Sequence, residues 1–434
     1  MKHSRSTAPA RRPARTLLAA GIVVAGAATA GTAAWLAADD EVPPGSATAS
    51  TPSQAATSPE PAPPTEPETE PEPEPEPEPA VFTILAGGDV LPHEWVHISA
   101  RTSDGYDFSP LLAGIDDWVA SADLALCHLE VPFTPAGQKV SGYPMFGASP
   151  LLADDLVDQG WDGCSTASNH SVDRAYAGVE TTLDRLGAVG LGHVGTARSA
   201  KEADAPQLYD VTVDGQVTRV AHLAATYGLN GLPMPAQQPW AVQLIDVDQL
   251  VDQARAARAD GADLVIVSVH AGNEYQPVPT DQQVEVAEAL AGSGLVDLMI
   301  GHHAHIPQPM ALLPGGPDGA GMWTAYGLGN MISNQDAEYC VPQTDSGLLL
   351  TATVEHAAGE AARVIGAEWT AITVDRKAGH VMHVLPEIPD GAATLSAGDV
   401  ADRYDRVRDV VDGSAPERTA PPEPTATVEV LPRG

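Results

Sequence analysis

The chain has 434 residues, enough for one large or two ordinary domains, and a formal net charge of −36 at pH 7. Binding to nucleic acid requires a positively charged surface, so this excess of acidic residues argues against a nucleic-acid partner. The three cysteines are too few for a disulfide-based scaffold.

The amino-terminal end is typical of a membrane anchor. Residues 1–15 form a basic segment, which we expect in the cytoplasm, and residues 16–38 carry no charged side chain. The alternative is a cleaved signal sequence, with Ala28-Thr29-Ala30 as the cleavage site. We favour a single-pass transmembrane anchor, because Trp35 lies near its outer end, where aromatic side chains are common. Both interpretations place the rest of the chain outside the cytoplasm, secreted if the segment is cleaved.

Residues 39–80 contain no apolar periodicity and include a Glu-Pro repeat from Glu70 to Pro79. Proline fixes the backbone angle φ, and neighbouring glutamates repel one another, so we expect a disordered, extended linker. At roughly 3 Å per residue, about 40 residues reach on the order of 120 Å. Such a linker would carry a folded domain away from the membrane and into the cell wall.

From residue 81 onward, short apolar runs alternate with helix-like segments. The expected strands are residues 81–86, 122–127, 161–165, 189–194, 263–269 and 296–300, and the expected helices are 111–120, 151–159, 178–186, 247–258 and 282–291. This alternation predicts an α/β domain, residues 81–412, whose sheets are covered by helices on both faces.

Other segments of this domain have antiparallel or capping signals. Asp214-Gly215 joins the runs 207–213 and 216–224 and predicts a hairpin. The runs 347–354, 363–374 and 380–385 predict antiparallel strands that close a second sheet. Residues 396–412 predict a terminal amphipathic helix with Ser396 as its cap, and the Pro- and Glu-rich residues 413–434 predict a disordered tail.

Two of the cysteines fall at predicted strand ends. A bridge between Cys127 and Cys164 is one option in an oxidising compartment, although we favour two buried free thiols.

Oxygen- and nitrogen-bearing side chains follow five of the predicted strands. They are Asp89, Glu130, Asn169, His170, His270, His303 and His305. Each alone has a structural explanation, such as a helix cap or a satisfied core histidine. Ligands of open α/β sheets gather outside the carboxyl ends of the strands, so the repetition predicts one shared site.

Histidine, asparagine and carboxylate groups together suit a pair of divalent cations such as Mn, Fe or Zn, with one carboxylate bridging them. Two such ions activate water and hold the oxygens of a displacement at phosphorus, while an unligated histidine protonates the leaving group. The predicted reaction class is therefore phosphoester hydrolysis. The sequence contains no Gly-x-Ser-x-Gly elbow or Walker loop that would indicate a serine hydrolase or an ATPase.

An ordered series of motifs resembles the capsule or poly-γ-glutamate synthesis family of the CapA type. The motifs are Gly88-Asp89-Val90, Leu129-Glu130-Val131-Pro132, Asn169-His170-Ser171-Val172-Asp173, His270-Ala271-Gly272-Asn273-Glu274-Tyr275, His303-Ala304-His305-Ile306-Pro307 and Gly327-Leu328-Gly329-Asn330. This family is related to the calcineurin-like metallophosphatases, and the resemblance implies a four-layer α/β/β/α sandwich.

The resemblance also implies roles for individual residues. Asp89 and His305 would bind a first metal ion, and Glu130 would bridge the pair. Asn169, His270 and His303 would bind the second ion, with His170 as the unligated acid. The remaining polar motif residues are candidate substrate-binding groups: His128, Asp173, Glu274, Tyr275 and Asn330. The sequence departs from the implied patterns at Leu91, where metallophosphatases have histidine, at His128, where the capsule family has asparagine, and at Ala271, where it has tryptophan.

Two functions follow from these expectations. The first is a membrane-anchored metallohydrolase outside the cytoplasm, acting on a phosphoester of a cell-envelope polymer or its phosphorylated precursor. The second is a non-hydrolytic accessory subunit of a membrane polymer synthase, in which the site binds metal or polymer. The family's association with capsule or poly-γ-glutamate synthesis fits both.

Overall fold

The computed structural model of the protein describes residues 78–411, 413 and 415–433. The predicted anchor and almost all of the predicted linker lie outside this part of the chain. Within it, no helix is both long and apolar enough to cross a membrane.

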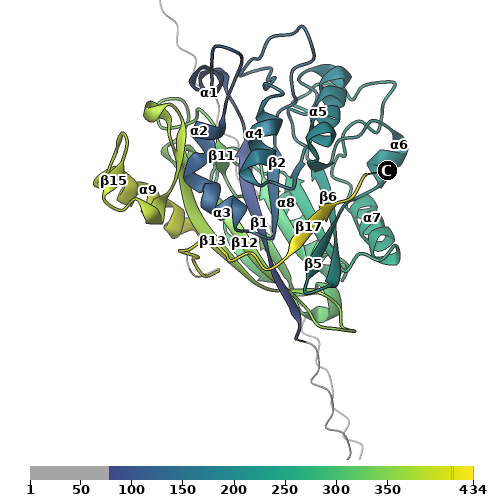
Figure 1. Cartoon of the computed structure of the whole chain (residues 1–434). Coiled ribbons are helices and arrows are strands. Elements are labelled where there is room, and N and C mark those ends of the chain that lie inside the picture. The colour runs from purple at the N-terminus through teal and green to yellow at the C-terminus, as the bar shows by residue number, and fades with distance from the viewer. Residues whose placement is uncertain (1–77, 412, 414, 434) are drawn as a thin grey trace, which may run out of the picture. The chain divides into compact units, whose positions relative to one another are not determined.

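The first sheet has eight strands, which are parallel in one half and antiparallel in the other (Figure 1). Its strands are β1 (Ala80–Val90), β2 (Leu124–Leu129), β3 (Gly163–Ser165), β4 (Gly192–Val194), β11 (Asn330–Ile332), β12 (Ser346–His356), β13 (Arg363–Asp375) and β14 (Val381–Val384). The order is β14-β13-β12-β1-β2-β3-β4, with β11 paired to β1. The three antiparallel strands were expected to close a second sheet. They extend the first sheet instead, because β12 pairs antiparallel with β1 from Ala86 to Ala80.

The second sheet has seven strands in the order β17-β5-β6-β7-β8-β10-β9. They are β5 (Gln207–Val213), β6 (Gln216–Thr226), β7 (Leu264–His270), β8 (Leu298–His302), β9 (Met310–Leu313), β10 (Met322–Ala325) and β17 (Thr427–Val430). The predicted hairpin between β5 and β6 is present. Asp214 and Gly215 have φ angles of 48° and 87°, which suit the tight turn of a two-residue hairpin.

The helices are α1 (Glu94–Ser99), α2 (Ser109–Leu112), α3 (Asp116–Ala120), α4 (Leu152–Gln159), α5 (Ala175–Val189), α6 (Ala200–Asp204), α7 (Val247–Ala259), α8 (Asp281–Gly292) and α9 (Ala397–Val411). A short hairpin, β15 (Gly391–Ala392) with β16 (Leu395–Ser396), precedes α9. The predicted helix 111–120 is divided into α2, a 3-10 turn and α3. The predicted cap of α9 is confirmed, since the Asp399 N–H donates to Ser396 Oγ over 3.2 Å.

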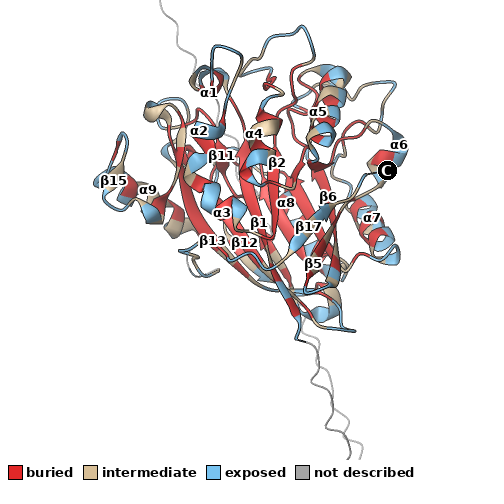
Figure 2. Cartoon of the chain, in the orientation of Figure 1, coloured by how far each residue is buried: buried red, intermediate tan, exposed pale blue. Residues whose placement is uncertain are grey.

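Three apolar clusters show how the layers pack. One contains Phe82 and Ile84 of the first sheet together with Tyr209 and Leu264 of the second, so the two sheets lie face to face. A second packs α3 and α4 against the outer face of the first sheet, and a third packs α7 and α8 against the outer face of the second. The result is an α/β/β/α sandwich whose strands are buried along most of their length (Figure 2).

The C-terminal segment corrects one prediction. Residues 415–433 were expected to be disordered, but β17 pairs antiparallel with β5. Asp123 accepts the N–H groups of Thr425 and Ala426, and the Arg433 guanidinium donates to backbone oxygens, including Thr196 O at 2.9 Å. Composition indicated disorder because the segment has little apolar surface of its own. It is ordered by the unpaired edge of β5 and by these polar contacts.

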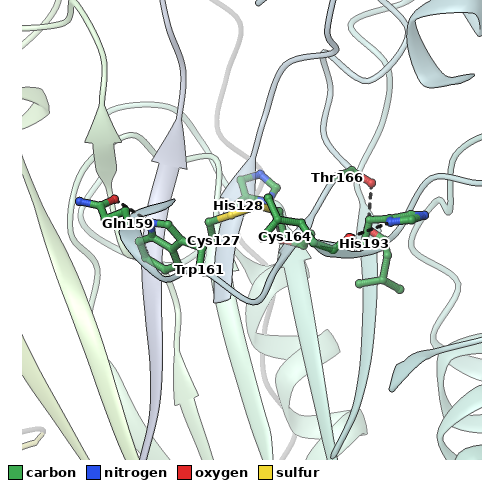
Figure 3. Close-up of a disulfide and its surroundings, with 10 residues drawn as sticks. Cys127, His128, Gln159, Trp161, Cys164, Thr166 and His193 are labelled. Carbon is green, nitrogen blue, oxygen red and sulfur yellow. Dashed lines mark hydrogen bonds between the residues drawn. A yellow bond between two sulfur atoms is a disulfide. The ribbon is translucent and has the colours of Figure 1, made fainter. Parts of the chain in front are cut away.

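The cysteines correct another prediction. Cys127 and Cys164 form a disulfide, with Cα atoms 4.4 Å apart, where free thiols were favoured (Figure 3). Both residues lie opposite each other in the neighbouring parallel strands β2 and β3. Sequence position indicated two strand ends but not their adjacency, which is what allows the bridge.

The carboxylate of Asp162, which lies just before β3, predicts a pH dependence of stability. Burial raises its pKa to about 6, against the opposing hydrogen bond from the Ala125 N–H. As the pH rises above about 4, the Asp162 carboxyl loses its proton in the unfolded chain but keeps it in the folded protein. The free energy of unfolding therefore falls until the folded protein also releases the proton near pH 6. Asp162→Asn keeps an acceptor for the Ala125 N–H and does not titrate. Its free energy of unfolding relative to wild type should therefore increase by about 2 kcal/mol as the pH rises from about 4 to about 6.

Urea denaturation of both proteins at pH 4.5 and pH 7 measures this difference. A stability difference between variant and wild type that is the same at both pH values would contradict the assignment to Asp162.

Candidate metal centre

The two sheets bring their ligand-bearing strand ends to one place. In the first sheet Asp89 of β1 pairs with His128 of β2, and Glu130 follows two residues later. In the second sheet His270 of β7 pairs with His302 of β8. The predicted convergence of strand ends is therefore confirmed as geometry.

Asp89, His128 and His270 form the first group of potential ligands. One ligand atom from each lies within 4.8 Å of the others, and all three residues are buried. His128 Nε2 lies 2.9 Å from His270 Nδ1, and the His128 ring stacks on the His302 ring with centroids 4.0 Å apart. The imidazole rings of this group therefore pack directly against one another and against His302.

Glu130, His303 and His305 form the second group, which meets the same distance criterion and is also buried. His305 links the two groups, because its Nδ1 lies 3.0 Å from Asp89 Oδ2 and its Nε2 lies 3.7 Å from Glu130 Oε1. His270 Nε2 is 3.9 Å from the same Glu130 oxygen. Glu130 therefore belongs to the second group and also lies close to His270 of the first group.

The polar groups of this centre fit a cation better than they fit one another. Among the described residues, both carboxylate oxygens of Glu130 and Nδ1 of His303 are buried without a hydrogen-bond partner. Burial of an unpaired carboxylate is costly, and native proteins normally satisfy such atoms or bind an ion with them. Oxygen and imidazole donors together suit Mn, Fe or Zn.

The pKa shifts agree with this chemistry. Burial lowers the pKa of His303 to about 3, and it lowers the pKa values of His128 and His270 well below the ordinary value. These imidazoles are therefore neutral and carry the lone pair that a metal requires. Burial raises the pKa of Glu130, whereas burial of His305 is outweighed by Glu130 and Asp89, which raise its pKa to about 9.

Asn169 and His170 follow β3 and lie beside these groups. Asn169 Oδ1 accepts from His270 Nε2 over 2.9 Å, so the predicted ligand is in the cluster. His170 Nδ1 lies 2.7 Å from Asp173 Oδ2, which also accepts the Phe146 N–H. This pairing fixes the His170 ring and leaves Nε2, which lies 3.4 Å from the Asn230 amide, directed away from the carboxylate.

The predicted substrate-binding residues occupy three kinds of position. His128 belongs to the first ligand group and Asp173 orients His170, as described above. Asn330 is buried and its Oδ1 accepts from His305 Nδ1 over 3.2 Å. Tyr275 is partly buried with its ring centroid 6.2 Å from that of His305, and Glu274 is exposed beside it. Only the last two are placed to meet a ligand from solvent.

Two residues of the centre were missed by the sequence analysis. His302 Nδ1 lies 3.5 Å from Asp89 Oδ1, and Asn230 bonds to both Asn169 and His170. The run of histidines contained the signal for His302. Its place in the centre depends on the pairing of β8 with β7, which sets His302 opposite His270 and which residue type alone does not predict.

The fold and the site together define an α/β/β/α protein with a buried histidine-carboxylate centre at the strand ends. Residues 83–335, more than half of the chain, match the family described as Bacterial capsule synthesis protein PGA_cap. The chain therefore belongs to this family, and the resemblance deduced from its motifs is confirmed.

Several known proteins are similar to the chain. The capsule biosynthesis protein CapA of Bacillus anthracis is 29% identical over 42% of this chain and 42% of its own length. The PGA biosynthesis protein CapA of Bacillus subtilis is 27% identical over 42% of this chain and 44% of its own. The chain thus spans less than half of these relatives. The solved structure of Haemophilus influenzae NAD nucleotidase (NadN) has a TM-score of 0.42 and 13% identity, covering 79% of this chain and 58% of that chain.

The unpartnered Glu130 carboxylate predicts that a divalent cation stabilises the fold. Added Mn²⁺ at about 100 times its Kd should stabilise the wild-type protein by about 2.7 kcal/mol. Glu130→Gln removes the central negative charge and should lose most of this gain. Thermal denaturation with and without Mn²⁺, together with metal analysis of the purified protein, measures the effect.

Glu274→Gln is the matched control, because it removes an exposed carboxylate beside the centre. An equal Mn²⁺ response in all three proteins, or none in the wild type, would contradict the assignment.

Proposed function

We propose that this protein is a membrane-anchored, extracytoplasmic phosphoesterase of envelope-polymer synthesis, dependent on two divalent ions, Mn, Fe or Zn. The observation that carries the proposal is Glu130, whose two oxygens are buried and unpartnered between two groups of potential ligands. A carboxylate in this position is what a two-metal hydrolase requires of its bridging ligand.

The ligand assignment follows the family resemblance. Asp89 and His305 would bind the first ion, Asn169, His270 and His303 the second, and Glu130 both, whereas the structure groups His270 with Asp89 and groups His305 with Glu130 and His303. Bound ions of this kind polarise phosphoryl oxygens and supply a nucleophilic water at neutral pH. Two of the assigned histidines, His270 and His303, have lowered pKa values, so they do not compete for the site as cations.

His170 is assigned the proton transfer to the leaving oxygen. It is nearly buried, and its Nδ1 is held by Asp173, which keeps the ring in one orientation. With Nδ1 engaged, Nε2 is the atom that meets the leaving group. The side-chain amide of Asn230 lies 3.4 Å from this nitrogen.

The proposed substrate class rests on the family to which the chain belongs, and the proposed location rests on its N-terminal sequence. The relatives named CapA are capsule or PGA biosynthesis proteins, and the chain shares their family. We therefore assign it to capsule, poly-γ-glutamate or related polymer synthesis, with a phosphoester of the polymer or its carrier as substrate. We also propose that the domain lies outside the cell membrane, in the cell wall, and the apolar sequence of residues 16–38 and the linker sequence support this location.

A second candidate function is supported by Leu91. This residue follows Asp89 by two positions, is almost fully buried and provides no ligand atom. A centre with fewer ligands suits a non-hydrolytic accessory subunit of a membrane synthase, in which metal or polymer is bound without turnover.

His170 provides the test between the two. In the full-length chain with Mn²⁺, His170→Asn should lower kcat for a generic phosphodiester by about 100-fold, since general acids contribute on that order. Bound metal should stay at the wild-type level, because His170 is not assigned as a ligand. Initial-rate kinetics and metal analysis on the same preparations measure both quantities.

Metal binding by the wild type with no turnover on any phosphodiester, together with co-purification of a membrane synthase, would favour the accessory function. Turnover that His170→Asn leaves intact would remove this residue from the mechanism.

A further inference from the structure

A groove of about 580 Å³ opens beside α1 and the loop that follows β2. Its lining includes Arg101, Thr134 and Lys139, with Glu94 at its rim. None of these residues belongs to the metal centre, and no role above accounts for them.

The loop that lines the groove also reaches the metal centre. The loop that carries Thr134 and Lys139 continues to Phe146, whose ring packs edge-on against His170 with centroids 4.7 Å apart. The Phe146 N–H donates to Asp173, the carboxylate that holds His170. The loop that lines the groove therefore also contacts the proposed acid through Phe146.

The charge of the groove is unusual for this protein. Most described arginines pair with a carboxylate, as Arg219 does with Asp210 at 2.8 Å. Among the described residues, Arg101, Lys139 and Arg174 have no carboxylate oxygen within the 4.0 Å that defines such a pair. In a chain of net charge −36, three neighbouring cations without acidic partners indicate an anionic ligand.

The polar atoms behind the groove are also unsatisfied. Thr134 is 5% exposed and its hydroxyl has no hydrogen-bond partner, and the buried Nε of Arg174 has none either. Both atoms approach Gly147, where any Cβ would collide with them. Glycine at this position therefore leaves the guanidinium and the hydroxyl room to lie together. Arg174 also donates to Lys139 O over 3.2 Å, which holds the loop in place.

We propose that this groove binds the carboxylate groups of an acidic chain whose adjoining part reaches the metal centre. The inference rests on the proposed function for the identity of the chain as a glutamate polymer. Arg101 and Lys139 attract successive carboxylates, and the Thr134 hydroxyl donates to one of them at the groove's inner end. Glu94 is the single acidic side chain among the lining residues, so the groove stays positive with Arg174 behind it.

The test is binding of fluorescently labelled γ-linked oligoglutamate to the full-length chain in non-ionic detergent. Anisotropy is measured at low ionic strength with a chelator present, so that metal ions contribute nothing. Arg101→Ala with Lys139→Ala should weaken binding about tenfold, and high salt should abolish the difference. Lys201→Ala with Arg255→Ala removes the same charge from exposed positions elsewhere and should bind as the wild type does.

Thr134→Val is a second variant that keeps the charge and the side-chain shape. It should weaken binding about threefold, since one hydrogen bond to a charged group is lost. Affinities equal in the groove and control variants, or no binding by the wild type, would overturn the proposal. Binding of inorganic polyphosphate in the groove without binding of oligoglutamate would overturn the assignment to carboxylates.

Failure of the proposed hydrolysis leaves this measurement unaffected, because the chelator removes the metal ions and no turnover is recorded. The two proposals therefore fail separately.

Discussion

The burial of two carboxylates at the junction of the sheets is the constraint on which the structure depends. Asp89 and Glu130 are both fully buried. Asp89 is compensated by imidazoles, which hold its pKa well below the ordinary range against the effect of burial. Glu130 has no hydrogen-bond partner among the described residues. Burial of a carboxylate without hydrogen bonds costs stability, and a bound cation would recover part of that loss.

The architecture satisfies this constraint by bringing backbones unusually close where the ligand residues begin. Gly88 precedes Asp89, and Gly301 precedes the histidine run. A Cβ at either position would collide with a backbone oxygen, that of Gly329 or of Tyr326. The ends of β1 and β8 therefore approach their neighbouring segments only because these residues are glycine. The disulfide between Cys127 and Cys164 lies one residue before the contact of His128 with Ser165, where Nδ1 and Oγ are 2.7 Å apart (Figure 3).

Much of the fold and the site was predictable because both depend on local patterns. The apolar run before Asp89 and the β-branched run before His270 marked buried strands, and strand ends in α/β sheets collect ligands. What failed depends on pairing between distant segments. The run of residues 347–354 indicated a strand but not that it pairs with β1, and the composition of residues 415–433 did not show the open edge of β5. The contribution of His302 depends on the pairing of β8 with β7, which sets it opposite His270.

Two of the three departures from the implied patterns, Leu91 and His128, lie close to Asp89. Leu91 supplies no donor and packs in the apolar cluster under the first sheet, so it removes a potential ligand beside Asp89. His128, where the family has asparagine, brings an imidazole to within 4.8 Å of the ligand atoms of Asp89 and His270. His128 therefore supplies a nitrogen donor near Asp89 from β2, whereas position 91, just after β1, supplies none. The centre has lost one potential ligand beside Asp89, but it keeps a nitrogen donor of the kind that divalent cations accept.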